Sequence, residues 1–204
     1  MMSRITLVGI ILLGCSRMSF GQYYDKTYSV ALDITAPLSN ADYVSQISAR
    51  GFRLGYREMI NDRFFAGFDF NNSSYTKYKP RRTYSNGTGA ITTDLFNYAY
   101  NYGITLSGEY YFKVEQRVMP YAGLGVGASY IKYKQFFNVY TNQSDSWGVL
   151  VRPQAGVQIR LKEDSKWAFQ AALHYDYSSA KNKDFDLGSF SSVGVNVGII
   201  MLSW

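Results

Sequence analysis

The sequence predicts an all-β fold, a closed barrel of eight antiparallel up-and-down strands that crosses a membrane. The first observation behind this prediction is a series of about eight segments in which aromatic or aliphatic residues alternate with small or polar ones. The clearest segment, residues 96–107 (FNYAYNYGITLS), keeps its Phe, Tyr, Ile and Leu residues on one parity. Successive side chains of a strand point to opposite faces, so each segment has one apolar and one polar surface. Strands that are apolar outside and polar inside are typical of barrels surrounded by lipid.

Two further observations support the barrel. The connections after the first, third, fifth and seventh segments are long and polar, whereas the other three are shorter, as in membrane barrels with short turns on one side. After residue 21, no apolar run approaches the ~18 residues of a membrane helix. The chain has 47% hydrophobic and 18% charged residues, with 19 Tyr, which excludes a disordered chain.

The first four strands follow from their alternation. A strand over 27–35 puts aromatic and aliphatic residues at every second position. A strand over 49–60 alternates Phe, Leu and Tyr with Arg and Gly, and the turn that follows it leads directly into a third strand around 66–71. Residues 75–93 are polar and are expected to form a long outer loop, after which the fourth strand runs over 94–112.

The last four strands are expected over 121–134, 147–161, 167–177 and 190–204, with a polar loop near 135–146. The fifth strand has glycine at 123, 125 and 127, which makes room inside a narrow barrel. This G-x-G-x-G spacing differs from a nucleotide-binding fingerprint. One His and no Cys in the mature chain cannot assemble a dense metal site, so no cofactor is expected. In the last strand the apolar parity switches after Ile199, which predicts a β-bulge there.

Residues 1–21 have the pattern of a cleaved signal peptide. Arg4 is the basic end, residues 5–14 (ITLVGIILLG) form a short apolar core, and small residues at 19 and 21 precede the cleavage point. The mature barrel domain is then 22–204. An alternative is that the sequence LLGC, which ends at Cys15, acts as a lipobox, in which case Cys15 is lipidated and not removed.

The predicted interior contains charged residues from several strands. An eight-stranded barrel is wide enough only for its own side chains, and buried charges must be paired. We therefore expect a salt-bridged network in the lumen, with a charged passage for a small solute as the alternative. The interior residues are Asp33, Arg53, Arg57, Asp69, Glu109, Arg152, Arg160, His174 and Asp176.

Two other groups of side chains are candidates for contacts with the envelope. Cations in the predicted outer loop are candidates for binding lipopolysaccharide phosphates or an acidic partner, with a solvated loop as the alternative. These cations are Lys77, Lys79, Arg81 and Arg82. Aromatic residues near strand ends are expected to form the two interfacial girdles. They are Tyr110, Tyr111, Phe112, Tyr121, Trp147, Trp167 and Tyr177.

Over about residues 23–204 the chain resembles the small eight-stranded outer-membrane barrels of the OmpA/OmpX type, the outer membrane protein β-barrel domain. The most specific pieces are PYAGLGVG at 120–127 and the terminal Trp204. The resemblance implies a bacterial outer membrane, contact with membrane lipids including lipopolysaccharide, and folding by the barrel-assembly machinery. In such families the terminal aromatic belongs to the assembly signal, a role that falls here on Trp204 together with Leu202.

The function is not fixed by this resemblance, because such barrels include adhesins, narrow channels and lipid-modifying enzymes. The first hypothesis is a non-enzymatic barrel with an envelope structural role or with loops that bind an unknown surface or periplasmic protein. The second is a narrow passive channel. The third is a lipid A-modifying hydrolase that uses His174, because HYDY at 174–177 resembles the His-x-Ser-Asn signature of lipid A deacylases, with Asp in place of Ser. Nucleic acid is excluded as a partner, because the net charge is only +6 and the cations are scattered.

Overall fold

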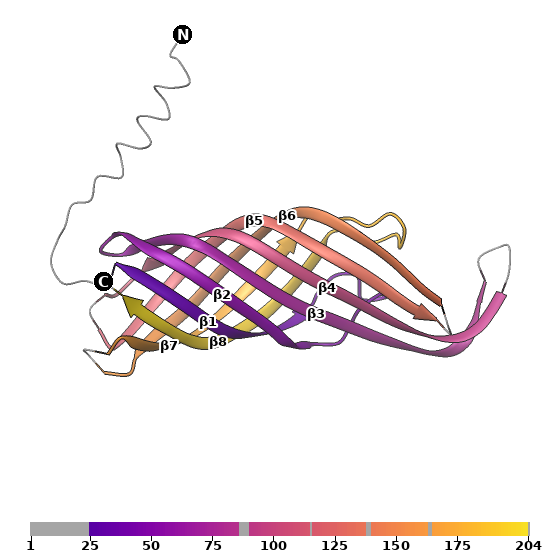
Figure 1. The fold of residues 1–204 in the computed structure, drawn as a ribbon, viewed down its shortest axis with the longest axis horizontal. Helices are drawn as coiled ribbons and strands as arrows, with labels where there is room; N and C mark the ends of the chain where they lie inside the picture. The colour runs from indigo at the N-terminus through magenta and orange to yellow at the C-terminus, as the bar shows by residue number, and fades with distance from the viewer. Residues whose placement is uncertain (1–24, 86–89, 115, 138–139, 163–164, 204) are drawn as a thin grey trace, which may run out of the picture.

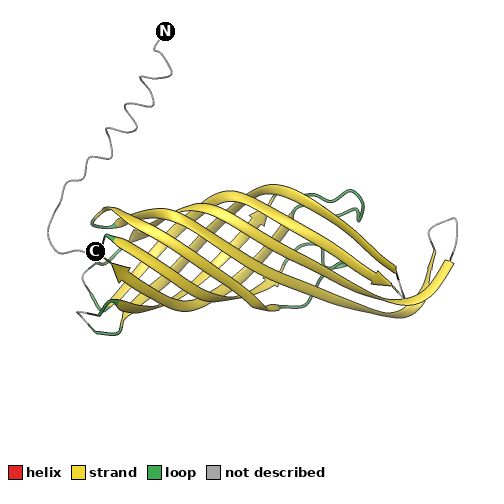
Figure 2. Ribbon diagram, viewed as in Figure 1, coloured by secondary structure: helices red, strands yellow, loops and turns green. Residues whose placement is uncertain are grey.

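The computed structural model describes residues 25–85, 90–114, 116–137, 140–162 and 165–203, and within them eight strands close into a barrel. Each strand pairs antiparallel with the next, and the first pairs with the last (Figure 1). The strands are β1 (Lys26–Pro37), β2 (Ser48–Asn61), β3 (Phe64–Ser85), β4 (Ala90–Tyr111), β5 (Val118–Phe137), β6 (Tyr140–Arg160), β7 (Trp167–Ser178) and β8 (Phe190–Ser203). Strands make up most of the described chain, and the loops lie at the two ends of the barrel (Figure 2). The described ranges contain no helix that is both long enough and apolar enough to span a membrane.

The barrel closes between β1 and β8 in an unbroken register. Residues pair continuously from Lys26↔Ser203 to Pro37↔Ser192, and the register between β7 and β8 is continuous as well. The predicted β-bulge near Ile199 is therefore wrong. The apolar parity switches because the inward residues themselves become apolar at this end of the strand. Ile200 and Leu202 point into the lumen, where they are 3% and 2% exposed.

Four strands are much longer than the others. β3, β4, β5 and β6 have 22, 22, 20 and 21 residues, whereas the other four have 12 to 14. Their outer ends continue past the rest of the barrel as a four-stranded sheet (Figure 1). We call residues 73–85, 90–101, 131–137 and 140–146 the protruding sheet.

The protruding sheet corrects two predicted loops. Residues 75–93 and 135–146 belong largely to strands, since pairing runs from Tyr75↔Ala99 to Ser85↔Ala90 and from Gln135↔Asn142 to Phe137↔Tyr140. Strands that stand clear of the membrane do not need one apolar face, so their polar composition resembles that of a loop. The register of β3 shifts between Lys79 and Arg82, around Pro80, which has no N–H for the ladder.

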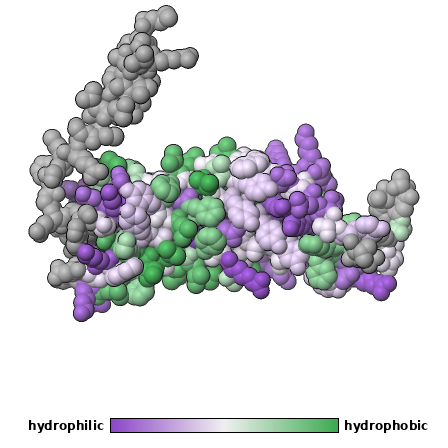
Figure 3. Space-filling model, in the orientation of Figure 1, coloured by the Kyte–Doolittle hydropathy of each residue, from purple (hydrophilic) through white to green (hydrophobic). Residues whose placement is uncertain are grey.

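The outward residues of the lower barrel form an apolar belt. Leu32, Ile104 and Leu106 are 68%, 62% and 75% exposed, as expected for side chains that contact lipid. The belt is visible as green residues on the face shown in Figure 3. The outer boundary of the belt is a row of paired residues, Asn72, Tyr102, Tyr130 and Trp147. Beyond this row the outward positions of the long strands are a mixture of polar, charged and aromatic residues.

The expected aromatic girdles are correct in part. Five of the residues project outward with 42% to 70% exposure: Tyr110, Phe112, Trp147, Trp167 and Tyr177. The assignments of Tyr111 and Tyr121 are wrong, because these residues are 4% and 2% exposed and lie inside the barrel. Both residues occupy inward-facing positions of β4 and β5, and proximity to a strand end does not by itself place a ring on the outer surface.

Candidate functional site

Four strands place the first part of an ionic network in the lumen. Asp69 on β3 lies 2.8 Å from Arg53 Nη2 and 2.9 Å from Arg57 Nη2, both on β2. Arg57 Nη2 also lies 2.8 Å from Glu109 Oε1 on β4. Gln154 on β6 accepts from Arg53 Nη1 at 2.5 Å and donates to Glu109 Oε1 at 2.8 Å. Two guanidinium groups and two carboxylates thus balance one another away from water.

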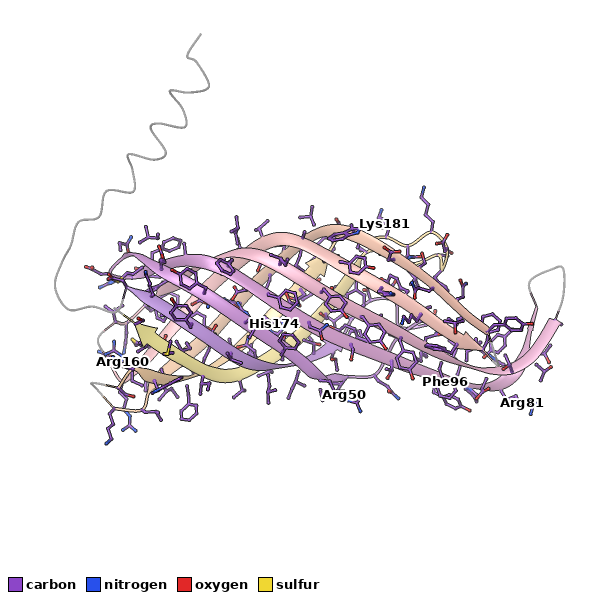
Figure 4. The ribbon with its side chains drawn as sticks, in the orientation of Figure 1. Arg50, Arg81, Phe96, Arg160, His174 and Lys181 are labelled. Atoms are coloured by element: carbon purple, nitrogen blue, oxygen red, sulfur yellow. The ribbon has the colours of Figure 1, made fainter. Side chains whose placement is uncertain are left out.

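The second part of the network is centred on Arg152. Its Nε and Nη2 donate to the two oxygens of Asp176 at 2.5 and 2.6 Å. Asp33 lies farther away, with Oδ2 at 3.9 Å from Arg152 Nη2. His174 Nε2 is 3.4 Å from Asp33 Oδ1 and 3.8 Å from Asp176 Oδ2, about midway along the barrel (Figure 4). This part contains one carboxylate more than its guanidinium groups, and His174 lies between the two carboxylates.

Arg160 lies apart from both parts of the network. It is half-buried near the short-turn end of the barrel (Figure 4), where its Nη2 contacts Met119 Sδ at 3.7 Å. Eight residues of an extended strand separate it from Arg152, which is about 27 Å. The structure therefore brings together every predicted interior residue except Arg160.

The glycines of β5 leave room for this network. A Cβ on Gly123 would lie 3.0 Å from both Gln154 Nε2 and Glu109 Cγ. At Gly127 the backbones approach even more closely, since a Cβ would lie 1.9 Å from the carbonyl oxygen of Ile104 on β4. Side chains larger than hydrogen at these positions would displace either the network or the neighbouring strand.

The outer mouth of the barrel is filled by an apolar group that we call the mouth cluster. Its members are Tyr43, Val44, Tyr75, Ala99, Ile131, Tyr133, Ala180 and Phe190, with Phe185 and Leu187 packed against them. The Tyr43 ring lies 5.4 Å from that of Tyr133 and 5.1 Å from that of Phe185. Burial here raises the pKa of the Tyr43 hydroxyl above its usual value, with a smaller contribution from Tyr133. The two loops that follow β1 and β7 thus fold into the mouth.

Hydrogen bonds hold the β1–β2 loop in the mouth. Asn40, which has a positive φ of 56°, accepts from the N–H groups of Tyr43 and Val44 at 2.8 and 3.0 Å. Asn97 Nδ2 on β4 donates to the Tyr43 carbonyl at 3.1 Å. This plug was not predicted from the sequence. The signal that was available is the adjacent apolar pair at 43–44, which follows the polar residues Ser39, Asn40 and Asp42 of the same connection.

A second apolar group, the lower cluster, fills the opposite end of the lumen. Its members are Phe65, Tyr111, Met119, Tyr121, Ala168, Ala172, Ile200 and Leu202. Its two tyrosine hydroxyls face the polar centre, where Tyr111 donates to Gln158 Oε1 at 3.0 Å and Tyr121 accepts from Gln170 Nε2 at 2.5 Å. Between the ionic network and the mouth cluster lie buried polar residues that include Thr35, Asn71, Ser73, Asn101 and Ser192. The described lumen is therefore layered, with charged and polar residues between two apolar ends.

The cations predicted to lie in an outer loop all lie on β3. Lys77 donates through Nζ to the Ala41 carbonyl, which ties the protruding sheet to the β1–β2 loop. Arg82 stacks its guanidinium 5.0 Å above the Tyr84 ring. Lys79 and Arg81 lie on either side of Pro80, where the register shifts, and Arg81 lies near the far end of the sheet (Figure 4). Lys77 and Arg82 thus each make a contact of their own, and the binding role of the four cations stays a prediction.

The outward face of the protruding sheet carries another set of residues, which we call the aromatic–lysine face. They are Tyr78, Phe96, Tyr98, Tyr100, Lys132, Lys134 and Phe136. Tyr98 stacks on Tyr100 at 6.2 Å and meets Phe136 edge-on at 5.6 Å. Lys134 Nζ lies 5.8 Å from the centre of the Tyr100 ring. Residues 96–101 were expected to lie in the membrane, whereas they lie beyond the Tyr102 row.

The predicted assembly signal is only partly within the described residues. Leu202 belongs to the lower cluster, and Trp204 lies outside the described ranges. The role of both residues in assembly stays a prediction.

A closed antiparallel barrel with an apolar belt outside and a polar, plugged lumen defines a small outer-membrane barrel protein. The chain belongs to the outer membrane protein β-barrel domain family, which its residues 7–200 match. It is accordingly a protein of the bacterial outer membrane. Barrels of this kind have their short turns on the periplasmic side and their longer loops outside.

Solved structures show the same fold. Neisserial surface protein A is 17% identical, with a TM-score of 0.53 over 87% of this chain and 96% of that one. The attachment invasion locus protein Ail of Yersinia pestis, in complex with the heparin analogue sucrose octasulfate, is 16% identical, with a TM-score of 0.51 over 88% of this chain and all of that one. No curated protein matches the sequence.

Proposed function

We propose that this protein is a non-enzymatic outer-membrane barrel that acts through its protruding sheet, in an envelope structural or surface-interaction role. The observation that carries the proposal is the contrast between the lumen and the outer ends of the long strands. The lumen is filled by side chains from the mouth cluster to the lower cluster, whereas β3 to β6 extend well beyond the lipid belt. A surface that extends this far is suited to contacts outside the membrane, and loops and exposed sheets on rigid scaffolds commonly bind partners.

The packing of the lumen argues against a passive channel. Ions crossing the barrel would have to displace Tyr43, Val44 and Phe185 at the mouth and then separate the Arg152–Asp176 pair. In a planar lipid bilayer we expect no steady single-channel current from the purified protein. Regular unitary conductance steps would support the channel and contradict the proposal.

The position of His174 argues against a lipid A hydrolase. Its side chain is completely buried on the inner face, between Asp33 and Asp176, so the barrel wall separates it from acyl chains outside. The hydroxyl of Ser178, a serine near it in sequence, is hydrogen-bonded to Ser129 at 2.5 Å within the lumen. Purified parent protein should release no fatty acid from lipid A. Release that is lost in His174→Ala would overturn the non-enzymatic assignment.

The role of the protruding sheet is testable by shortening it. Thr76 and Tyr98 are direct cross-strand partners, as are Tyr133 and Ser144. A two-residue Asn-Gly turn can therefore replace residues 77–97, and a second one residues 134–143, without a change of register. The shortened barrel keeps every member of the mouth cluster but loses the outer part of the sheet.

The readout is the outer-membrane barrier in cells that lack the parent gene, measured as uptake of a hydrophobic dye. The parent and a matched lumen variant, His174→Gln, should restore the barrier. The shortened barrel should fold, as judged by heat-modifiable gel mobility, but should not restore it. Full restoration by the folded, shortened barrel would contradict a function of the sheet.

A further inference from the structure

We propose that the aromatic–lysine face binds the phosphorylated saccharide of the lipopolysaccharide molecules that stand next to the barrel. This inference depends on the proposed function, because it assigns a ligand to the protruding sheet. It concerns the outward face of that sheet and does not involve the β3 cations singled out in the sequence.

The aromatic–lysine face begins at the level of the lipid headgroups. The row Tyr102, Tyr130 and Trp147 ends the apolar belt, with Ile104 and Val126 two to four residues below it on the lipid side. Lys132 lies two residues beyond Tyr130, about 7 Å along the strand. A lipid whose acyl chains contact the belt must therefore place its headgroup beside Tyr100 and Lys132. In the outer leaflet of this membrane that lipid is lipopolysaccharide, whose headgroup is a phosphorylated saccharide.

The side chains of this face suit a phosphorylated sugar. Lys132 and Lys134 are cross-strand partners of Tyr100 and Tyr98, so two ammonium groups lie beside two phenol rings on one surface. Lysine is suited to phosphate as a flexible point charge, and tyrosine offers an apolar ring with a hydroxyl at its edge, which suits a sugar. Phe136 and Phe96 continue the apolar surface outward, and Phe96 projects from the sheet in Figure 4.

Neighbouring charges distinguish the two lysines. Lys132 lies between Tyr100 on β4 and Asp145 on β6, and the carboxylate of Asp145 reduces the positive potential around Lys132. Lys134 has Gln143 in the equivalent position, so its charge is not offset in this way. A phosphate would thus be held chiefly by Lys134 above the Tyr98–Tyr100 stack, with Lys132 nearer the membrane.

The probe is purified lipopolysaccharide that carries lipid A and a phosphorylated inner core without O-antigen. It is titrated into parent barrel reconstituted in phosphatidylcholine vesicles, and binding is followed by the shift in thermal midpoint of the heat-modifiable gel band. The variant Lys132→Gln/Lys134→Gln can no longer form two charge-assisted hydrogen bonds to phosphate, and its apparent binding should be weaker by about tenfold or more. Lys132→Arg/Lys134→Arg should retain most of the binding.

The matched control removes the same charge on the same side of the membrane. Lys181→Gln/Lys183→Gln alters two exposed lysines of the β7–β8 loop, outside the aromatic–lysine face, and should bind like the parent. Dephosphorylated lipopolysaccharide should bind the parent about as weakly as the glutamine variant of the face binds the intact lipid. The inference would be overturned if Lys132→Gln/Lys134→Gln and Lys181→Gln/Lys183→Gln lost equal amounts of binding. It would also be overturned if dephosphorylated lipopolysaccharide bound the parent as well as the intact lipid does.

The dye-uptake assay separates this inference from the proposed function. If Lys132→Gln/Lys134→Gln binds lipopolysaccharide like the parent while the shortened barrel still fails to restore the barrier, the ligand assignment is wrong and the sheet keeps its role. If the shortened barrel restores the barrier, the proposed function is wrong whatever the binding result.

Discussion

The guanidinium of Arg152 holds the carboxylate of Asp176 through two parallel hydrogen bonds, of 2.5 and 2.6 Å, in the interior of the barrel. The two residues lie on neighbouring strands, β6 and β7, and both are almost completely buried. A buried pair of this kind adds little net stability, because burying the two charges costs several kcal/mol each. Removal of only one of the two residues, however, leaves the charge of the other buried and uncompensated.

Arg152→Met should therefore strongly destabilise the barrel. It leaves Asp176 and Asp33 in the lumen without their guanidinium, and removal of one partner from a buried pair costs about 3 to 5 kcal/mol. The measurement is urea unfolding in phospholipid vesicles, followed by gel mobility. The double variant Arg152→Met/Asp176→Leu should recover much of the loss. A single variant as stable as the parent would show that the pair is not important for folding.

Two aspartates in the same lumen should respond differently to neutralisation. Among the described residues of the network, three guanidinium groups face four carboxylates, and Asp33 is the carboxylate with the longest contact to an arginine, 3.9 Å. Asp33→Asn removes the excess charge and should change the free energy of unfolding by less than about 1 kcal/mol.

Asp69→Asn is the matched comparison. Asp69 lies within 2.9 Å of both Arg53 and Arg57, so its neutralisation leaves two guanidinium groups with Glu109 alone. It should cost about 3 kcal/mol or more in the same urea experiment. Equal effects of the two substitutions would contradict the charge balance derived from the structure.

The mouth cluster should control access to the lumen from outside. Ser129 lies in the lumen, is fully buried, and precedes Ile131 of the mouth cluster by one inward position. A Ser129→Cys thiol should react slowly with a small charged thiol reagent added outside. Added Tyr43→Ala and Phe185→Ala substitutions should accelerate the reaction by at least about tenfold, since they remove rings that pack 5.1 Å apart.

An exposed thiol provides the control for this labelling. Thr141→Cys lies on the exposed outer end of β6 and should react rapidly with or without the loop substitutions. Rapid labelling of Cys at 129 in the otherwise unaltered barrel would mean that the mouth is open, and it would revive the channel hypothesis.

The barrel core was predictable because lipid outside and a narrow lumen inside impose a strict period of two. In β4, residues 96–107 alternate as expected, and Thr105 and Ser107 point inward while Ile104 and Leu106 point outward. The interior charges could be found by the same rule, since Arg53, Arg57 and Asp69 share the parity of small residues on their strands.

The rule fails where its physical cause is absent. Residues 75–93 lie largely beyond the lipid, where neither face must be apolar, so a polar composition was mistaken for a loop. At the two ends of the lumen the inward side chains become apolar, which inverts the pattern at Ile200 and Leu202 and hides Tyr111 and Tyr121. The plug formed by Tyr43 and Phe185 depends on two loops that meet in space, which no local pattern reports.

The close approach of the β4 and β5 backbones at Gly127 provides the last prediction. A Cβ on Gly127 would lie 1.9 Å from the Ile104 carbonyl oxygen and 2.6 Å from Thr105 Cα, and both atoms belong to the backbone of β4. Gly127→Ala must therefore shift the strands themselves, and not merely a flexible side chain. Overpacking of this kind costs about 1 to 3 kcal/mol, which should appear as a lower urea midpoint and a lower folded yield in vesicles. Gly188→Ala is the matched control, because nothing lies within 4 Å of its Cβ position, and it should change stability by less than about 0.5 kcal/mol. If Gly127→Ala folds with the yield and midpoint of Gly188→Ala, the close contact between β4 and β5 is not a constraint on the barrel.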